Sequence, residues 1–201
     1  MTEILQLDEQ LFHLINSDWH VSWLDTIMPL WRDKKTWIPL YLLLAIFAVV
    51  RFKLRGVWWM MALILTVGAA DATSSHLIKK NVKRVRPCND PVMKADVQLL
   101  AGCGKGYSFT SSHATNHFAM ATFIALTLGL LYSWLRWPFW LWAGSIAFGQ
   151  VYVGVHYPLD VLVGSILGIF IGWLMANLYQ KRVFSITRHE EGKFLYAREG
   201  A

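Results

Sequence analysis

Charged residues are scarce in this sequence. Lys, Arg, Asp and Glu together make up 16% of its 201 residues, where a soluble domain carries about 25%. Hydrophobic residues supply 55%, and tryptophan occurs 11 times, which is typical of membrane proteins with aromatic belts at the interface. This composition argues against a soluble all-α enzyme. It favours a single-domain helical integral membrane protein, residues 1–201.

Cysteine is almost absent. Cys88 and Cys103 are the only two, and both fall in one polar segment, residues 79–111. They lack the second close pair of ligands that a zinc site needs, and no acidic cluster offers a magnesium site. Two free thiols are one alternative. A bridge is the other: it would close a loop of about 15 residues, stabilise the fold by about 3 kcal/mol, and persist only in an oxidising compartment.

The N-terminal region, residues 1–35, lacks both a signal peptide pattern and a continuous apolar run. MTEILQLDEQ has no basic region followed by an apolar core, so we expect no cleaved signal. Ile4, Leu7, Leu11 and Leu14 recur at helical spacing. This pattern predicts one or two amphipathic helices lying at the membrane interface. A first membrane crossing in this region is the alternative.

Five apolar runs follow, and they predict an all-α bundle of five to six transmembrane helices. The runs cover residues 37–52, 57–78, 112–135, 138–153 and 159–179. A polar, basic tail, residues 180–201, comes last. Because successive crossings alternate in direction, segment 79–111 and the turn 154–158 should emerge on the same face. In the last run Gly164, Gly168 and Gly172 repeat every four residues, which predicts close packing against a neighbouring helix.

The net charge of +6 comes mostly from short loops between apolar runs. This distribution favours lipid headgroups or a phosphorylated ligand as partners, and it argues against nucleic acid. Both faces of the bundle carry basic residues, so the positive-inside rule does not orient the chain. If the cations of segment 79–111 bind an anion, they should be left out of the positive-inside count. The remaining basic residues then place the tail in the cytoplasm.

Three short stretches carry residues suited to chemistry on a phosphate. In LIKKNVKRVRPCND, a helix continued past the membrane would place Lys79 and Arg86 on one face, two turns apart, before Pro87 ends it. Two such cations suit a phosphate, although a headgroup-binding patch is the alternative. In GYSFTSSHATNHF, Ser111 and His113 lie at the start of a predicted helix, where free N–H groups form an anion site.

The third stretch is VGVHYPLDVLVG. Pro158 is favoured at the first position of a helix, which puts Asp160 in the first turn, where the helix dipole stabilises a carboxylate. His156 lies within reach of Asp160. A carboxylate that accepts a hydrogen bond from one ring N–H leaves the other ring nitrogen with a basic lone pair. His156 is therefore a candidate nucleophile or base, with a structural cap as the alternative.

Together these stretches resemble the type 2 phosphatidic acid phosphatase superfamily of membrane lipid phosphatases. The family's first motif, a lysine followed by six residues and Arg-Pro, is matched by Lys79, Arg86 and Pro87. The His-x-x-x-Asp of its third motif is matched by His156 and Asp160. Its Pro-Ser-Gly-His is matched in part by Thr110, Ser111, Ser112 and His113. The Ser-Arg pair that opens its third motif is replaced by Gly149 and Gln150.

The resemblance implies a fold, a reaction and a set of roles. His156 would attack phosphorus and form a phosphohistidine, Asp160 would orient it, and His113 would protonate the leaving oxygen and then activate water. Five residues would hold the phosphate: Lys79, Arg86, Ser111, Ser112 and Gln150.

The scheme needs no metal or other cofactor. The partner would be a membrane lipid phosphate: undecaprenyl diphosphate, phosphatidylglycerol phosphate, phosphatidic acid or a lipid A phosphate. The protein would lie in a bacterial inner membrane, with its site on the extracytoplasmic side. The neutral Gln150 leaves one alternative open, a catalytically weak protein that binds or translocates lipid phosphates.

Overall fold

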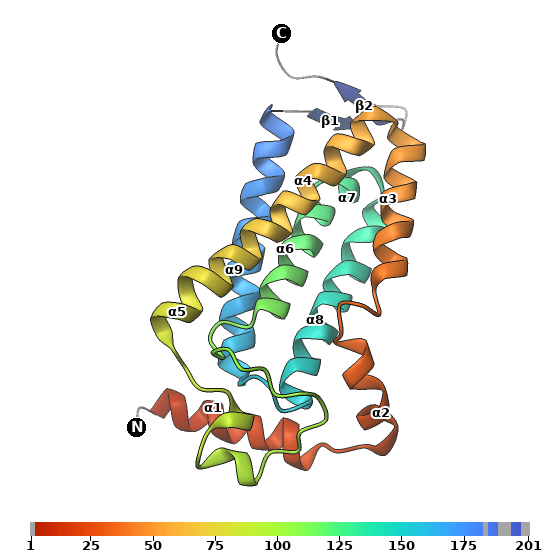
Figure 1. The fold of residues 1–201 in the computed structure, drawn as a ribbon. Coiled ribbons are helices and arrows are strands. Elements are labelled where there is room, and N and C mark those ends of the chain that lie inside the picture. Colours follow the sequence, from red (N-terminus) through yellow and green to blue (C-terminus); the bar gives the residue numbers. More distant parts are fainter. Residues whose placement is uncertain (1–2, 183–184, 189–193, 198–201) are drawn as a thin grey trace.

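The computed structural model describes residues 3–182, 185–188 and 194–197, which form a bundle of long helices (Figure 1). The long helices are α3 (Ile38–Phe52), α4 (Leu54–Asp71), α6 (Ser112–Leu126), α8 (Arg136–Tyr152) and α9 (Pro158–Arg182). They overlap the five predicted apolar runs, but the third run, 112–135, is not one helix, because the backbone of Thr127 (φ −116°, ψ −82°) ends α6. Three helical stretches have the length and hydropathy to cross a membrane, namely Leu54–Val82, Ser112–Leu131 and Pro158–Lys181, and Ile38–Phe52 is a shorter apolar helix. The predicted all-α membrane bundle is confirmed.

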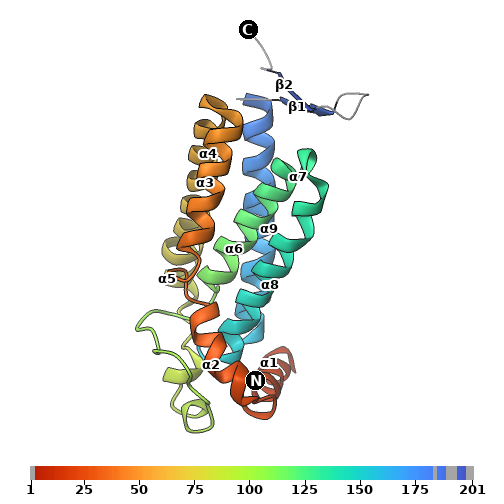
Figure 2. The same ribbon diagram turned by 90° about the vertical axis from the view of Figure 1, so that its right-hand side faces the viewer.

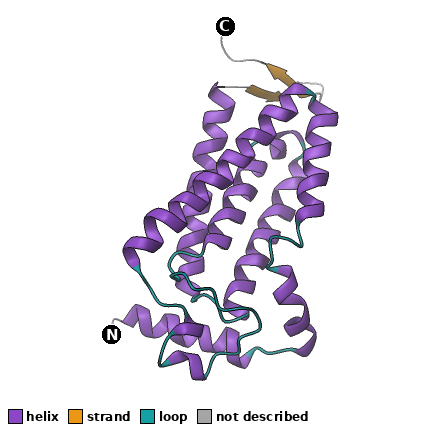
Figure 3. Cartoon of the chain, viewed as in Figure 1, coloured by secondary structure: helices purple, strands orange, loops and turns teal. Residues whose placement is uncertain are grey.

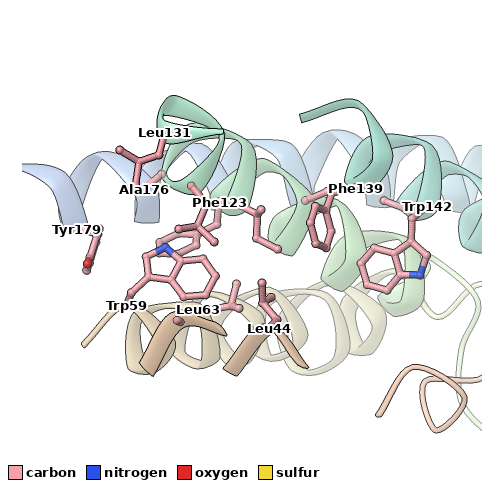
Figure 4. Packing of buried hydrophobic residues seen from close by; sticks show 14 of the residues in the cluster. Leu44, Trp59, Leu63, Phe123, Leu131, Phe139, Trp142, Ala176 and Tyr179 are labelled. Carbon is pink, nitrogen blue, oxygen red and sulfur yellow. The ribbon is translucent and has the colours of Figure 1, made fainter. Parts of the chain in front are cut away.

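Helix α6 is the centre of the bundle. It packs against α9, α8 and α4, and α3 packs against α4 on the outside. A view from the side shows α6 between the α3–α4 pair and α8 (Figure 2). Buried Trp59, Phe123, Phe139 and Trp142 fill the space between these helices (Figure 4). The outer surface is also apolar, with large exposed side chains such as Leu141, as a surface facing lipid requires.

The N-terminal region forms α1 (Glu3–His13), a π-helical turn η1 (Leu14–Asp18) and α2 (Ser22–Trp31). Helices α1 and α2 have 11 and 10 residues, and at 1.5 Å per residue each is only about 15–17 Å long. Neither is long enough alone to cross the ~30 Å hydrocarbon core. Helix α1 lies across one end of the bundle (Figure 1).

Most of the loop structure gathers at the end of the bundle where α1 lies (Figure 3). The connection from α4 runs through a π-helical stretch η2 (Ala72–Ile78), a short α5 (Lys79–Val82), and two 3-10 turns, η3 (Pro87–Asn89) and η4 (Met93–Ala95). Between α6 and α8 lie α7 (Leu128–Leu131) and a 3-10 turn, η5 (Ser133–Leu135).

The helix predicted from Lys79 to Arg86 is wrong, because α5 ends at Val82. Lys83 adopts a left-handed conformation with φ of 54°, and its N–H donates to the carbonyl of Lys79 at 3.0 Å, which closes the helix. Arg86 is extended, with φ −77° and ψ 151°, as expected for a residue that precedes a proline. It reaches the site from an extended segment instead of a helix face.

The tail holds two short antiparallel strands, β1 (Ser185–Arg188) and β2 (Phe194–Ala197), with Ser185 opposite Ala197. The sequence analysis did not predict them. Their β-branched and aromatic residues favour strands, but each apolar stretch is short and lies within a polar, basic segment, so the pattern did not indicate a strand. The rest of the predicted tail beyond Arg182, residues 183–184, 189–193 and 198–201, lies outside the described residues.

The glycine stripe of α9 packs directly on α6, as predicted. A Cβ at Gly164, Gly168 or Gly172 would lie 2.8, 2.3 or 2.4 Å from the carbonyl oxygens of Ser111, Thr115 and Ala119, respectively. These distances are too short for a real contact, so any side chain there must push the two helices apart.

We expect Gly168→Ala to lower the free energy of unfolding of the detergent-solubilised protein by about 1–3 kcal/mol, the usual cost of overpacking. Gly144→Ala is the matched control, because a Cβ there has nothing within 4 Å. Melting curves of the two variants check this. Equal melting temperatures would show that the α6–α9 contact tolerates a wider spacing.

Candidate active site

The loop that follows α5 and the turn between α8 and α9 meet at one end of the bundle. The N–H of Leu100 donates to the carbonyl of Val153 at 3.2 Å, and the N–H of Ser111 donates to the carbonyl of Asp160 at 3.0 Å. The prediction that segment 79–111 and turn 154–158 share a face is therefore confirmed. The three candidate stretches lie together at this end.

His156 is buried in the turn that precedes α9, and its two ring nitrogens face different partners. Nε2 lies 3.1 Å from Nη1 of Arg86. Because a guanidinium only donates hydrogen bonds, Nε2 accepts and keeps its lone pair. Nδ1 then carries the proton, 3.2 Å from Oγ of Ser108 and 3.5 Å from Oδ2 of Asp160. Burial lowers the pKa of His156 to about 4, against the opposing effect of Asp160, so the imidazole is neutral at pH 7.

Asp160 is fixed from three sides in the first turn of α9. Its Oδ2 accepts the N–H of Tyr157 at 3.0 Å, which caps the helix, and a hydrogen bond from the hydroxyl of Ser108. Its Oδ1 accepts a bond from Nη1 of Arg84 at 2.8 Å. The carboxylate is thus held ionised beside His156, as the predicted orienting residue requires.

Arg84, Asp8 and Ser108 are site residues that the sequence analysis missed. Nη2 of Arg84 donates to Oδ2 of Asp8 at 2.6 Å, so one guanidinium bridges Asp8 and Asp160. Oδ1 of Asp8 accepts the N–H of Leu159 at 2.7 Å. Burial raises the pKa of Asp8, and Arg84 opposes this shift. The amphipathic helix α1 is therefore tied to the start of α9 through Asp8.

Lys79 and Arg86 carry positive charge to the same place. Nζ of Lys79 is buried and donates to the carbonyls of Tyr107 and Ser108 at 3.1 and 3.5 Å. Arg86 donates from Nε to the carbonyl of Gly106 at 2.9 Å. Neither cation has a carboxylate within ion-pair distance among the described residues. Both are positioned by neutral groups, which leaves their charge available to an anion.

The start of α6 presents the other predicted phosphate-binding groups. Ser111 is the N-cap, and its buried hydroxyl has no hydrogen-bond partner among the described residues. The hydroxyl of Thr110 is also buried without a hydrogen-bond partner among the described residues. Ser112 is differently placed: its Oγ lies 3.0 and 2.9 Å from the hydroxyls of Ser74 and Ser75 in η2. An incoming oxygen therefore meets Ser111 and the free N–H groups of this first turn.

His113 opens onto a cavity of about 660 Å³ between α3, α4 and α6. Most of its lining is apolar, from residues such as Leu44 and Leu63. Asp71 and Asn116 add polar groups close to His113, and Lys34 lies at the cavity wall. A cavity of this kind suits an acyl chain whose polar end reaches the histidine.

Gln150 is fully buried, and both ends of its amide are used inside the protein. Its Oε1 accepts hydrogen bonds from Nε and Nη2 of Arg32, at 3.0 and 2.8 Å, and its Nε2 lies 3.3 Å from the carbonyl of Ile146. One amide N–H therefore points into α8, and Arg32 covers the amide oxygen.

Cys88 and Cys103 form a disulfide, with an S–S distance of 2.02 Å. It joins the two ends of the loop that follows Arg86. Within the described residues no group of three or more His, Cys, Asp or Glu could hold a metal ion.

Comparison with known proteins places this site in a family. The sequence model of the PAP2 superfamily matches residues 56–184. Over 185 residues, covering 90% of this chain and 81% of the relative, the chain is 31% identical to a lipid A 4'-phosphatase of Bacteroides thetaiotaomicron. It is 27% identical over 178 residues to an undecaprenyl-diphosphatase of Sulfolobus acidocaldarius, covering 84% and 77% of the two chains.

Solved structures agree. The crystal structure of Aquifex aeolicus LpxE is 26% identical and matches with a TM-score of 0.66, over 85% of this chain and 95% of that one. These relatives are phosphatases, so the alternative of a protein that only binds or translocates lipid phosphates is not favoured. The chain belongs to the PAP2 superfamily and is a metal-independent lipid phosphate phosphatase of the membrane.

Proposed function

We propose that His156 is the nucleophile of this phosphatase and His113 its acid and base. Nε2 of His156 attacks phosphorus, and the bond from phosphorus to the lipid oxygen breaks while His113 gives that oxygen a proton. His113 then takes a proton from water as the water oxygen attacks the phosphohistidine. The P–N bond breaks, inorganic phosphate leaves, and His156 is neutral again. The lone pair on Nε2, fixed by Arg86, supports this assignment.

The cations and the start of α6 stabilise the charge on the transferring phosphoryl group. Arg86 shifts one N–H from the imidazole of His156 to a phosphate oxygen, which also frees the nucleophile. Lys79 adds a second charge, and Ser111 donates its unpartnered hydroxyl. Asp160 stabilises the positive charge that develops on His156. Ser112 acts through the backbone N–H of the first helical turn.

We further propose that the substrate is a phosphate monoester on an acylated amino sugar of the lipid A type. The observation that carries this choice is the polar pair in the lipid cavity, Asp71 and Asn116. Nδ2 of Asn116 donates to Oδ1 of Asp71 at 3.1 Å. The amide oxygen of Asn116 is a buried acceptor without a partner among the described residues. Sugar hydroxyl and amide N–H groups supply donors of this kind, and a polyprenyl chain does not. The lipid A 4'-phosphatase relative adds support.

The proposed setting is a bacterial inner membrane with the site on the extracytoplasmic side. The Cys88–Cys103 disulfide lies in the loop that carries Arg86, and such a bridge persists in an oxidising compartment. The tail, residues 180–201, then lies in the cytoplasm. The N-terminal region, residues 1–35, lies at the extracytoplasmic interface.

Phosphate release from a matched set of substrates tests this proposal. Detergent-solubilised enzyme should hydrolyse a lipid A phosphate with kcat/KM at least tenfold above phosphatidic acid, phosphatidylglycerol phosphate and undecaprenyl diphosphate. Asn116→Leu should reduce the kcat/KM ratio between the lipid A phosphate and the other lipids. Its kcat/KM on phosphatidic acid should stay within about threefold of the wild-type value. Equal turnover of all four lipids would contradict the amino-sugar assignment without affecting the catalytic one.

We expect hydrolysis to continue in excess EDTA and to stop with orthovanadate. Vanadate adopts the five-coordinate geometry of the transferring phosphoryl group, so Lys79 and Arg86 should bind it more tightly than phosphate. Assays with EDTA, with added magnesium, and with a vanadate titration check both parts. Activity lost in EDTA and restored by magnesium would contradict the metal-free scheme.

A further inference from the structure

We propose that Arg32, outside the segment matched by the family model, binds the substrate phosphate as the third cation of the site, with Gln150 holding it in place. This inference rests on the proposed phosphate site and adds a residue to it. The family model begins at residue 56, and Arg32 follows directly after α2 in the N-terminal region. The observation that carries the proposal is a fork of two hydrogen bonds from Arg32 to a fully buried amide.

The amide oxygen of Gln150 uses one edge of the guanidinium and leaves the rest free. Nε and Nη2 of Arg32 converge on Oε1 of Gln150. Nη1 and the second N–H of Nη2 are not used by this contact. Among the described residues the structure gives the Arg32 side chain no other hydrogen bond and no carboxylate partner. A partly buried guanidinium in this condition has only the more distant charge of Asp33 to offset its own, and a phosphate would supply a direct counter-ion.

Arg32 lies near the other site residues, because its partner Gln150 also accepts the N–H of His156 through its backbone carbonyl at 3.2 Å. Arg32 is close enough to His113 and to Arg86 to interact electrostatically with both. Burial lowers the pKa of Arg32, the charge of Arg86 adds to this effect, and the carboxylate of Asp33 opposes it. The like charges of Arg32 and Arg86 repel each other, and an anion bound near both would offset that repulsion. Arg32 and Arg86 therefore flank the position that the doubly charged phosphate would take.

The two departures from the third motif fit this arrangement together. Gln150 supplies a neutral acceptor where an arginine side chain would repel Arg32. Gly149 lies against the same segment: a Cβ there would be in ordinary contact, at 3.4 Å, with both the Cβ of Arg32 and the Sδ of Met28. Position 149 therefore borders Arg32, and Gln150 gives the guanidinium an anchor. The charge that the third motif lacks comes from the N-terminal region.

Calorimetric titration of orthovanadate into the detergent-solubilised protein tests the inference without a lipid substrate. Arg32→Ala should weaken vanadate binding at least tenfold, the usual effect of losing one charge-assisted hydrogen bond. Lys35→Ala removes an exposed cation from the same segment and is the matched control; it should bind as wild type does. Gln150→Ala should weaken binding less. The double variant should match Arg32→Ala, because Gln150 acts through Arg32.

Kinetics separate this inference from the proposed function. Arg32→Ala should lower kcat/KM at least tenfold on any lipid phosphate that the wild type hydrolyses. A lower melting temperature with unchanged vanadate affinity would overturn the inference, because it would give Arg32 a structural part only. If Arg32→Ala does not fold, Arg32→Gln decides: it keeps much of the side-chain volume but removes the charge, and wild-type vanadate affinity together with wild-type kcat/KM would likewise overturn the inference. A wild type that binds vanadate but hydrolyses none of the lipids tested would contradict the proposed function alone.

Discussion

His156→Ala should reduce hydrolysis of every lipid phosphate by at least about 10³-fold, because the variant lacks the atom that forms the covalent intermediate. The substrate can still bind, since Lys79 and Arg86 keep their backbone partners. Rapid quenching with a labelled substrate should trap an acid-labile, alkali-stable phosphoenzyme in the wild type and none in the variant. His76→Ala, which removes an exposed histidine on the extension of α4, is the control.

His113→Ala should respond differently, because in the proposed mechanism His113 protonates the leaving group. An aryl phosphate such as p-nitrophenyl phosphate has a leaving group that needs no proton. On that substrate His113→Ala should form the phosphoenzyme at close to the wild-type rate and then accumulate it, since water activation is also lost. On a lipid phosphate it should fail at the first step. Wild-type turnover of a lipid phosphate by purified His156→Ala or His113→Ala would exclude the residue concerned from its proposed part in the chemistry.

Arg84→Met should destabilise the fold more than any other single substitution considered. Arg84 is the one cation paired with both Asp8 and Asp160 among the described residues. Its removal leaves two buried carboxylates without a paired cation, and breaking a buried pair costs about 3–5 kcal/mol. Met keeps most of the volume over the ring of Tyr157, which the guanidinium covers at 3.9 Å. The expected result is therefore an electrostatic loss, measured as a lower melting temperature.

Second variants make this prediction specific. Adding Asp8→Asn to Arg84→Met should recover part of the loss, because only Asp160 then remains unpaired. The deficit should also shrink as the pH falls. Burial already raises the pKa of Asp8 with Arg84 in place, and the loss of Arg84 raises it further, so protonation of Asp8 at low pH restores stability. Lys80→Met removes an exposed cation nearby and should melt as wild type does. An Arg84→Met protein that melts with the control would show that water, not Arg84, compensates these carboxylates.

The proposed catalytic pair could be predicted because its signal is local. His156 and Asp160 are four residues apart around a helix start, and His113 lies in the first turn after a Ser-rich cap. Parity of the crossings was enough to bring these stretches to one face. Lys79 and Arg86 were correctly placed at that face, but for a wrong reason. A continuous helix was expected where Lys83 and Pro87 impose a left-handed stop and an extended segment.

The missed residues all act through partners distant in sequence. Arg84 joins side chains 76 residues away on either side, and Arg32 contacts a residue 118 positions later. Such pairs have no period and no spacing that a single sequence can show. The local sequence around each residue also does not indicate its partner. Asp8, for example, reads as one polar residue of an amphipathic helix, and only the fold shows that it contacts the start of α9.

That contact between Asp8 and the start of α9 has a consequence for the timing of synthesis. The N–H of Leu159 that Asp8 accepts is 151 residues further along the chain. The ribosome has therefore made about four-fifths of the protein before helix α1 can take its final place, and earlier helices must enter the bilayer while it waits. Arg84, meanwhile, has only half of its counter-charge. The catalytic centre is consequently among the last parts of the enzyme to mature, and a nascent chain that stalls before its final crossing carries no hydrolytic activity.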